Sequence, residues 1–275
     1  MSISLGVSAE ARPAALDIGG TWTRVRYGDA TTRFPTEPDY DRQLAALIAA
    51  VPPGAPAIGV SFGGRVTPAG EVRVALNLRG YEGRPLAADL STALGAPVRI
   101  AHDATCGLLG ECYTGALRGH DRCGYLTLST GVGAALRLGG VWLTTEAGHQ
   151  LVAGNDHPCD CGQTGCLQTL TGGGALHRRL GRPLSDVHDE HFWRAYAESM
   201  ALGVANFALS AGLEAVALGG AIPLSRAELW PSLRGALARI LTYQRVTVLP
   251  AELGETAPLT GAALLPSLPP DAILH

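Results

Sequence analysis

The chain contains no lysine, and all 21 of its basic residues are arginine. A P-loop nucleotide site needs a lysine on the phosphates, and Schiff-base chemistry needs a lysine amine. Both kinds of site are therefore excluded for this sequence. We attribute the arginine-only usage itself to genome composition rather than to function.

Long apolar runs, runs of like charge and a secretory leader are also missing. No apolar segment reaches the roughly 18 residues that cross a bilayer, and residues 1–10 lack the positive region of a signal peptide. A net charge of -3, without a basic run or an acidic tail, argues against nucleic acid or a membrane as partner. Half of the six cysteines lie in one metal-type cluster, which suits a reducing compartment. We therefore expect a cytoplasmic protein.

The composition is that of a folded globular protein. The 275 residues are 47% hydrophobic and 16% charged, which provides a substantial core. This length predicts one two-lobed domain or two small ones.

The most specific motif lies in residues 146–168. His149, Cys159, Cys161 and Cys166 offer one imidazole and three thiolates, a complete tetrahedral shell for zinc that leaves no position for a catalytic water. The alternative is a few disulfides or unrelated free thiols, but Cys159 and Cys161 are too close to pair comfortably. The motif therefore predicts a structural zinc site.

A second motif is the turn after the first apolar strand. Asp17 ends this strand and is followed by Gly19, Gly20 and Thr21. Two glycines let backbone amides approach an anion closely, and the threonine adds a hydroxyl donor. A carboxylate beside such a turn suits a divalent cation. An ordinary hairpin over residues 14–34 is the alternative reading.

The strand, Gly/Thr turn, strand pattern recurs about 110 residues later, at 124–139. Two such turns from similar halves could hold a polyphosphate. A dinucleotide site is excluded, because the third glycine is missing and a strand follows. A third glycine turn follows the strand 215–218. The candidate phosphate-binding residues of these later turns are Thr130, Gly131, Gly133, Gly219 and Gly220.

Polar residues at strand ends and in loops are further candidates. The strand 97–101 delivers His102 and Asp103 to the start of a helix, where a carboxylate is either functional or a helix N-cap. Asn77 lies in a loop and could bind sugar hydroxyls or cap a turn.

A nucleophile elbow is the competing interpretation of Gly59-Val-Ser61-Phe-Gly63. The order Ser61, Asp103, His149 would suit an α/β-hydrolase triad. The elbow requires a helix directly after the serine, which the following Gly-Gly-Arg-Val-Thr-Pro cannot form. The sequence therefore disfavours a hydrolase.

Helical patterns of apolar residues predict helices in six further segments. They are 39–51, 85–94, 104–117, 166–180, 189–212 and 226–242.

Taken together, these motifs resemble the ROK family of repressors, open reading frames and sugar kinases. The resemblance runs from Asp17-Ile-Gly-Gly-Thr21 to Leu259-Thr-Gly-Ala-Ala263, and its most specific part is Glu146-Ala-Gly-His149 with the cysteine cluster. It implies an α/β, actin-like (ribonuclease H-like) fold of two lobes, with an interlobe cleft and a structural zinc site. The expected lobes are 1–105, completed by a C-terminal helix at 257–275, and 106–256.

The resemblance also implies roles for individual residues. Asp103 would be the general base, and His149 would hold zinc through one nitrogen. The residues expected at ATP phosphates and Mg²⁺ are Asp17, Gly19, Gly20, Thr21, Thr130, Gly131 and Gly133, with Gly219 and Gly220 near the adenosine. The residues expected at the sugar are Gly64, Asn77, His102, Asp103, Glu146, His149 and Gln168. A homodimer is implied as well.

The chain departs from the family pattern at several positions. His102 replaces the usual asparagine, Gln168 the usual glutamate, and Ser129 a common glycine; residues 62–64 lack the usual Pro-Gly, and the chain is short around 177–190. Gln168 gains donors but loses charge, so one sugar hydroxyl is expected to be held differently. His102 could alter the basicity of Asp103.

The leading interpretation is an ATP-dependent kinase for the primary hydroxyl of a hexose, with glucose first, or of an N-acylated hexosamine. The alternative is a non-catalytic sugar sensor. Family repressors carry an N-terminal helix-turn-helix, for which a first strand beginning by residue 14 leaves no space, so no DNA partner is expected.

Overall fold

The computed structural model describes residues 12–274 and divides them into two compact units. One unit runs from the first described residue to Gly110 and resumes at Pro258; the other is Glu111–Ala257. The chain passes between the units within α3 (Asp103–Thr114) and at the start of α9 (Ala257–Leu264). The prediction that residues 1–10 are not a signal peptide concerns a segment outside the described part.

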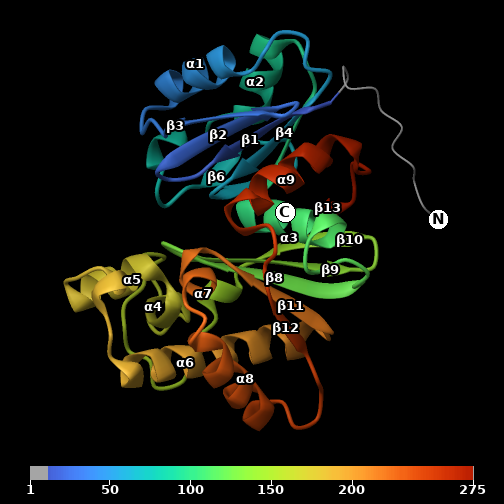
Figure 1. Ribbon diagram of the computed structural model, residues 1–275. Coiled ribbons are helices and arrows are strands. Elements are labelled where there is room, and N and C mark those ends of the chain that lie inside the picture. Colours follow the sequence, from blue (N-terminus) through green and yellow to red (C-terminus); the bar gives the residue numbers. More distant parts are fainter. Residues whose placement is uncertain (1–11, 275) are drawn as a thin grey trace. The chain divides into compact units, whose positions relative to one another are not determined.

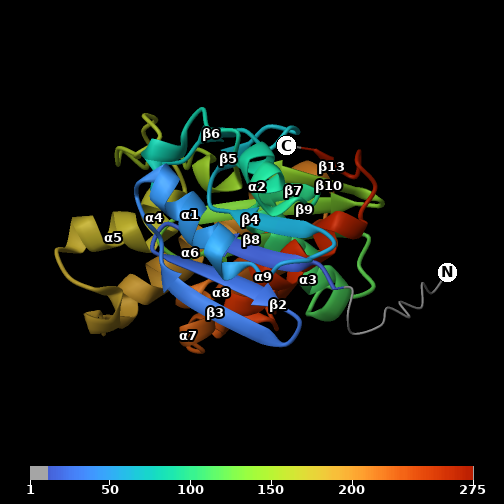
Figure 2. The same cartoon turned by 90° about the horizontal axis from the view of Figure 1, so that it is seen from above.

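The first unit is built on a five-stranded sheet of order β3-β2-β1-β4-β7 (Figures 1 and 2). β2 pairs antiparallel with both β1 and β3, whereas β1, β4 and β7 are parallel. Helices α1 and α2 lie side by side in both views. The remaining elements of this unit are β1 (Ala14–Ile18), β2 (Trp22–Tyr27), β3 (Ala30–Pro35), α1 (Tyr40–Ala50), β4 (Ile58–Phe62), β5 (Arg65–Val66), β6 (Val72–Val74), η1 (Arg79–Tyr81), α2 (Leu86–Leu94), β7 (Val98–His102), η5 (Leu265–Ser267) and β13 (Ile273–Leu274).

The second unit contains adjacent strands in the order β12-β11-β8-β9-β10. β9 pairs antiparallel with β8 and β10, whereas β8, β11 and β12 are parallel. The elements are β8 (Arg122–Leu128), β9 (Val132–Leu138), β10 (Val141–Thr145), η2 (Ala147–His149), α4 (Gln168–Thr171), α5 (Gly173–Leu180), η3 (Leu184–Asp186), α6 (Glu190–Ala211), β11 (Ala215–Gly219), α7 (Ala221–Ser225), α8 (Leu229–Ile240), β12 (Thr247–Pro250) and η4 (Gly254–Thr256).

The two sheets share one topology. In each unit, three consecutive strands form an antiparallel meander. The next strand of the sheet pairs in parallel with the first strand of the meander, and the last strand pairs in parallel with that one. Both parallel additions follow helical crossovers, as parallel pairing requires. The fold is thus the duplicated α/β arrangement of the actin-like class, as predicted.

Helix α6 shows why these segments fold as they do. Buried apolar residues recur every three or four positions, which places them on one face against the core of the second unit. The Asp189 side chain accepts hydrogen bonds from the amides of His191 and Phe192, and Gly212 ends the helix at φ 60°. Figure 1 shows α8 alongside α6, and these two helices make extensive contact.

The structure corrects several predicted boundaries. The helix predicted over 166–180 is two helices, α4 and α5, because Gly172 is extended at φ -83° and ψ 130°. The helix predicted over 226–242 begins only at Leu229, after the short α7. The helix predicted over 104–117 ends at Thr114. The hairpin predicted over 14–34 is a three-stranded meander, since β3 adds to β2.

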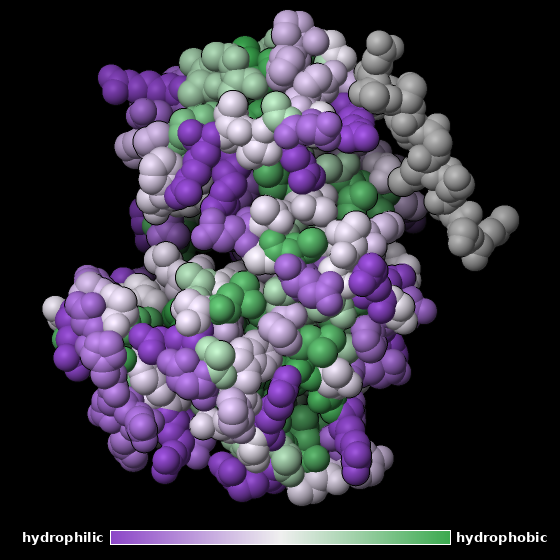
Figure 3. Space-filling model, in the orientation of Figure 1, coloured by the Kyte–Doolittle hydropathy of each residue, from purple (hydrophilic) through white to green (hydrophobic). Residues whose placement is uncertain are grey.

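The surface shown in Figure 3 mixes hydrophilic residues with small apolar patches. In the described part of the chain, no helix is both long and apolar enough to cross a membrane.

Glycine makes close backbone packing possible in the first unit. A Cβ on Gly59 of β4 would overlap the carbonyl group of Ala262 in α9, and one on Gly261 would overlap the carbonyl group of Cys106 in α3. Helix α9 therefore packs in backbone contact with β4 and α3, although it is far from both in sequence.

We predict that Gly59→Ala destabilises the protein by about 3 kcal/mol, at the upper end of overpacking costs, because the obstacle is backbone and cannot rotate away. Urea unfolding measures the effect. Gly140→Ala is the control, since its Cβ would meet no atom within 4 Å. Equal stability of the two variants would contradict close packing of α9.

Candidate functional site: two carboxylates, two glycine turns and a cysteine cluster

Parallel pairing brings the candidate residues of the first unit to one edge of its sheet. Asp17 of β1 is in register with Ser61 of β4, which is in register with Ala101 of β7. Asp103 follows two residues after Ala101, at the first position of α3. Carboxyl ends of parallel strands are a common location for functional side chains.

Asp17 is a buried carboxylate with a well-defined set of partners. Its Oδ1 accepts a hydrogen bond of 2.8 Å from Ser61 Oγ, and its Oδ2 pairs with Arg24 Nη1 at 3.1 Å. Burial raises the pKa of Asp17, and the charge of Asp103 acts in the same direction, against the hydrogen bond of Ser61 and the charge of Arg24. A cation placed beside these two acids would relieve their repulsion.

The turn after β1 is held from both sides. The Gly19 amide donates to the carbonyl of Trp22 at 3.1 Å, and the Thr36 hydroxyl donates to the carbonyl of Gly19 at 2.7 Å. Gly20 and Thr21 are exposed at the tip. The predicted phosphate turn is therefore a fixed structure with accessible residues.

Asn77, a predicted sugar-binding residue, lies against this turn, and Gly63 lies near Asp103. A Cβ on Gly20 would lie 2.8 Å from the Cβ of Asn77, so only glycine fits beside this asparagine. A Cβ on Gly63 would lie 3.8 Å from Asp103 Oδ2. Gly64 packs against the β6 backbone, where a Cβ would overlap the carbonyl of Val74. The first unit thus gathers its candidate residues at one edge.

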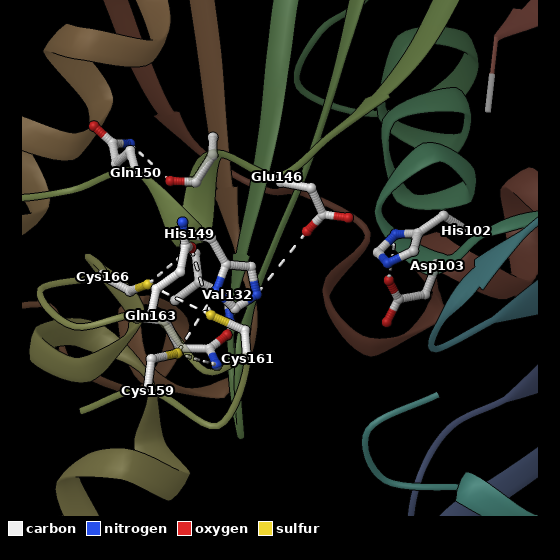
Figure 4. A network of polar contacts seen from close by, with 12 residues as sticks. His102, Asp103, Val132, Glu146, His149, Gln150, Cys159, Cys161, Gln163 and Cys166 are labelled. Carbon is white, nitrogen blue, oxygen red and sulfur yellow. Dashed lines mark hydrogen bonds and ion pairs between the residues drawn. The ribbon is translucent and has the colours of Figure 1, made fainter. Parts of the chain in front are cut away.

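Asp103 lies beside His102. His102 Nδ1 is 3.0 Å from Asp103 Oδ1 and accepts a hydrogen bond of 3.1 Å from the Ala104 amide (Figure 4). Burial acts to raise the pKa of Asp103, but a protonated His102 and the Ala104 amide outweigh it, so this pKa lies below its ordinary value.

In the second unit, the turn between β8 and β9 rests on the start of α5. The amides of Gly173 and Gly174 donate to the carbonyls of Ser129 and Thr130 at 2.7 and 2.8 Å. Gly220 lies against β8, with φ 89°, and a Cβ there would overlap the Leu128 backbone. The predicted residues Thr130, Gly131, Gly133, Gly219 and Gly220 therefore belong to one region of this unit.

Gln168, the first residue of α4, joins this turn to the cysteine cluster. Its Oε1 accepts a hydrogen bond of 2.9 Å from the Val132 amide, and its Nε2 lies 3.9 Å from Cys159 Sγ. A glutamate could accept from Val132 but could not donate to a sulfur.

The four predicted zinc ligands converge (Figure 4). The ligand atoms of His149, Cys159, Cys161 and Cys166 all lie within 4.8 Å of one another. His149 Nδ1 is 3.6 Å from Cys159 Sγ, and Cys161 Sγ is 3.7 Å from Cys166 Sγ. A tetrahedral zinc site has nitrogen–sulfur edges of about 3.5 Å and sulfur–sulfur edges of about 3.8 Å. Two ligand separations therefore match a tetrahedral zinc site, and all four ligand atoms lie close enough together to bind one ion.

Neighbouring side chains orient these ligands. Glu146 Oε2 lies 4.0 Å from His149 Nε2, on the side of the ring opposite the sulfurs. The Gln163 side-chain amide lies 3.5 Å from both Cys161 Sγ and Cys166 Sγ. Its oxygen and nitrogen are interchangeable in assignment, and the nitrogen is the group that suits thiolates. A carboxylate on histidine and amide donors on sulfur are usual partners of zinc ligands.

Sequence reasoning missed three contributors. Arg24 pairs with Asp17 across β1 and β2, a partnership that depends on strand register. Gly173 and Gly174 hold the second turn, and the run of three glycines at 172–174 was an available signal. Gln163 contacts two sulfurs.

The hydrolase alternative is excluded. Ser61 is fully buried within β4, and its hydroxyl is committed to Asp17. β4 continues to Phe62 and is followed by β5 rather than by a helix.

Comparison with known proteins agrees with these features. The ROK family model matches residues 14–267, and the chain belongs to the ROK family. A glucokinase of Thermotoga maritima is 34% identical over 159 residues, 54% of this chain and 50% of that protein, so the match spans about half the length of this relative. An N-acetyl-D-glucosamine kinase of Escherichia coli is 28% identical over 90% of this chain and 97% of its own.

A solved relative has the same fold. The crystal structure of a ROK hexokinase from Thermus thermophilus superposes with a TM-score of 0.80, at 29% identity, over 92% of this chain and 97% of that one. The predicted actin-like fold and family are confirmed, and the histidine and three cysteines are consistent with the zinc site of this family.

We predict one tightly bound zinc per chain, lost in Cys161→Ser. Cys161 is exposed, so its loss removes a ligand without opening a core cavity. Metal analysis gives the stoichiometry, and a chelator should lower the melting temperature of the unmodified protein but not of the variant. Cys106→Ser, outside the cluster, should keep its zinc. Less than a few tenths of a zinc per unmodified chain would refute the site.

Proposed function

We propose that this protein is an ATP-dependent sugar kinase that phosphorylates the primary hydroxyl of a hexose, with Asp103 as general base. The observation that carries the proposal is the position of Asp103, at the end of β7 and beside the turn that follows Asp17. A base must lie within hydrogen-bond reach of the hydroxyl whose proton it takes, and a carboxylate at this accessible strand end meets that need.

In the first unit, we propose that three residues around Asp103 form the part of the site that binds the sugar, which accepts the phosphoryl group. Asn77 would hydrogen-bond a sugar hydroxyl, and it is exposed for that purpose. Gly63 brings the neighbouring loop near Asp103, and the lack of a side chain on Gly64 lets that loop pack against the backbone of Val74. This arrangement would orient the attacking oxygen toward the base.

The first unit would also bind ATP, the phosphoryl donor. The amides of Gly19 and Gly20 and the hydroxyl of Thr21 would bind its phosphate oxygens. Asp17 would hold Mg²⁺, directly or through water. When bound, this ion neutralises the charge that phosphoryl transfer develops, a role suited to an ion next to two carboxylates.

The second unit carries the remaining proposed contacts. Thr130, Gly131 and Gly133 would bind phosphates, and Gly219 and Gly220 would lie by the adenosine. Glu146, His149 and Gln168 would bind the sugar. Zinc would fix the shape of the segment that presents these side chains and take no part in the chemistry, since four protein ligands close its shell.

Glucose is the proposed substrate, with an N-acylated hexosamine next. The named relatives include a glucokinase and an N-acetyl-D-glucosamine kinase. The Gln168 side chain, engaged by Val132 and Cys159, has less freedom to hold a sugar hydroxyl than a free carboxylate would. We further propose a homodimer.

A sugar sensor without catalysis is the second candidate, favoured by His102 and Gln168 in place of the family's usual residues. The two functions differ in turnover: a kinase consumes ATP only with its sugar present, whereas a sensor binds sugar and consumes none.

We predict sugar-dependent ADP release from ATP and Mg²⁺ with one member of a panel: glucose, mannose, fructose, galactose, N-acetylglucosamine and N-acetylmannosamine. Asp103→Asn should lower kcat by about a hundredfold or more, as expected for loss of a general base. Asp29→Asn, an exposed carboxylate, should leave the rate unchanged.

The zinc content and unfolding midpoint of each preparation serve as controls for folding. If the folded, zinc-loaded protein turns over no sugar but binds one by calorimetry, the sensor function replaces the kinase. If Asp103→Asn retains the full rate, Asp103 is not the base.

A further inference from the structure

His102 Nδ1 faces two groups with opposite requirements. The Ala104 amide is a donor, 3.1 Å away, and requires a lone pair on this nitrogen. Asp103 Oδ1 is an acceptor, 3.0 Å away, and requires a proton on the same nitrogen. One imidazole nitrogen carries either a lone pair or a proton, so it can satisfy only one of these two neighbours at a time.

The two protonation states of His102 therefore place Asp103 in different environments. In the neutral state, Nδ1 accepts from Ala104, and Asp103 Oδ1 is buried without a hydrogen-bond partner among the described residues. The nearby Ala104 amide still favours the charged carboxylate, but no imidazolium does, so the carboxylate is a stronger base than in the protonated state of His102. In the protonated state, the imidazolium pairs with Oδ1 and stabilises the charged carboxylate, which becomes a weaker base.

Two ionisable groups near Asp103, Asp17 and Cys106, do not take over this role. Asp17 is near Asp103, but its own partners are Ser61 and Arg24. Cys106 of α3 is fully buried, and its pKa is raised well above the ordinary value by burial and by the two nearby acids, so it remains a neutral thiol. On β4, the register neighbour of His102 is Phe62, which carries no charge.

We propose that His102 is a positioning residue whose protonation state switches Asp103 between a reactive base and a paired, unreactive carboxylate. Its connection with turnover rests on the kinase function proposed above. His102 is the last residue of β7 and Asp103 is the first residue of α3, so two regular elements hold these adjacent side chains close to each other.

The first test is the pH dependence of kcat/KM for sugar phosphorylation in the unmodified protein and in His102→Asn. Asparagine keeps an acceptor for the Ala104 amide but gains no proton. Because histidine ordinarily titrates near pH 6.5, the unmodified protein should lose about tenfold between pH 7.5 and 5.5, and the variant about twofold or less. His188→Asn, an exposed residue of the second unit, should behave like the unmodified protein. Superimposable profiles for the unmodified protein and His102→Asn would overturn the proposal.

The second test needs no turnover and separates this proposal from the kinase function. The imidazole signals of His102 are followed by NMR against pH in the unmodified protein and in Asp103→Asn. Loss of the carboxylate should lower the midpoint of the His102 titration by about one pH unit. The same midpoint in both proteins would show that the two side chains are not coupled. A shifted midpoint without any sugar turnover would retain the pair and reject the kinase.

Discussion

The parallel pairing of β1, β4 and β7 is the constraint on which the rest of the first unit depends. Their register fixes Asp17 opposite Ser61, and Ser61 opposite Ala101, so two acids from distant parts of the sequence reach one edge. Backbone hydrogen bonds hold this register, and a slip of one residue would turn every side chain to the other face. The electrostatics follow from it: Asp17 is buried near a second acid, and Arg24 and Ser61 partly compensate its charge.

In the second unit, the cysteine-containing segment is not held by strand pairing. Residues 150–167 form only isolated bridges and turns, and their position depends on a few backbone contacts and on the four convergent ligands. A closed zinc shell would give this segment the rigidity that a sheet gives elsewhere. Gln168 extends this rigidity to the β8–β9 turn, since one side chain reaches both Val132 and Cys159. Glutamine in place of the family's glutamate therefore adds a donor toward the Cys159 sulfur, in addition to the change in sugar binding proposed above.

Much of the fold could be predicted because its signals are local. The helix predicted over 189–212 was found within one residue at each end, because its apolar periodicity lies within the segment; the structure adds the caps at Asp189 and Gly212. The cysteine spacing likewise predicted the four ligands that the structure brings together. The break at Gly172 was missed because three successive glycines can continue or end a helix, and their hydrogen bonds to Ser129 and Thr130 decide which.

The sequence by itself determined the alternation of strands and helices, the two glycine turns, the cluster of one histidine and three cysteines, and the family, because each depends on residue type and short spacing. Tertiary structure alone decided that Arg24 and Ser61 both contact Asp17, and that α9 packs on β4 at Gly59 and on α3 through its own Gly261. It also decided that His102 Nδ1 lies between Ala104 and Asp103. These contacts depend on strand register and on distances of a few tenths of an ångström. Composition and periodicity carry no information at that scale, so the environment of the proposed base could be read only from the folded chain.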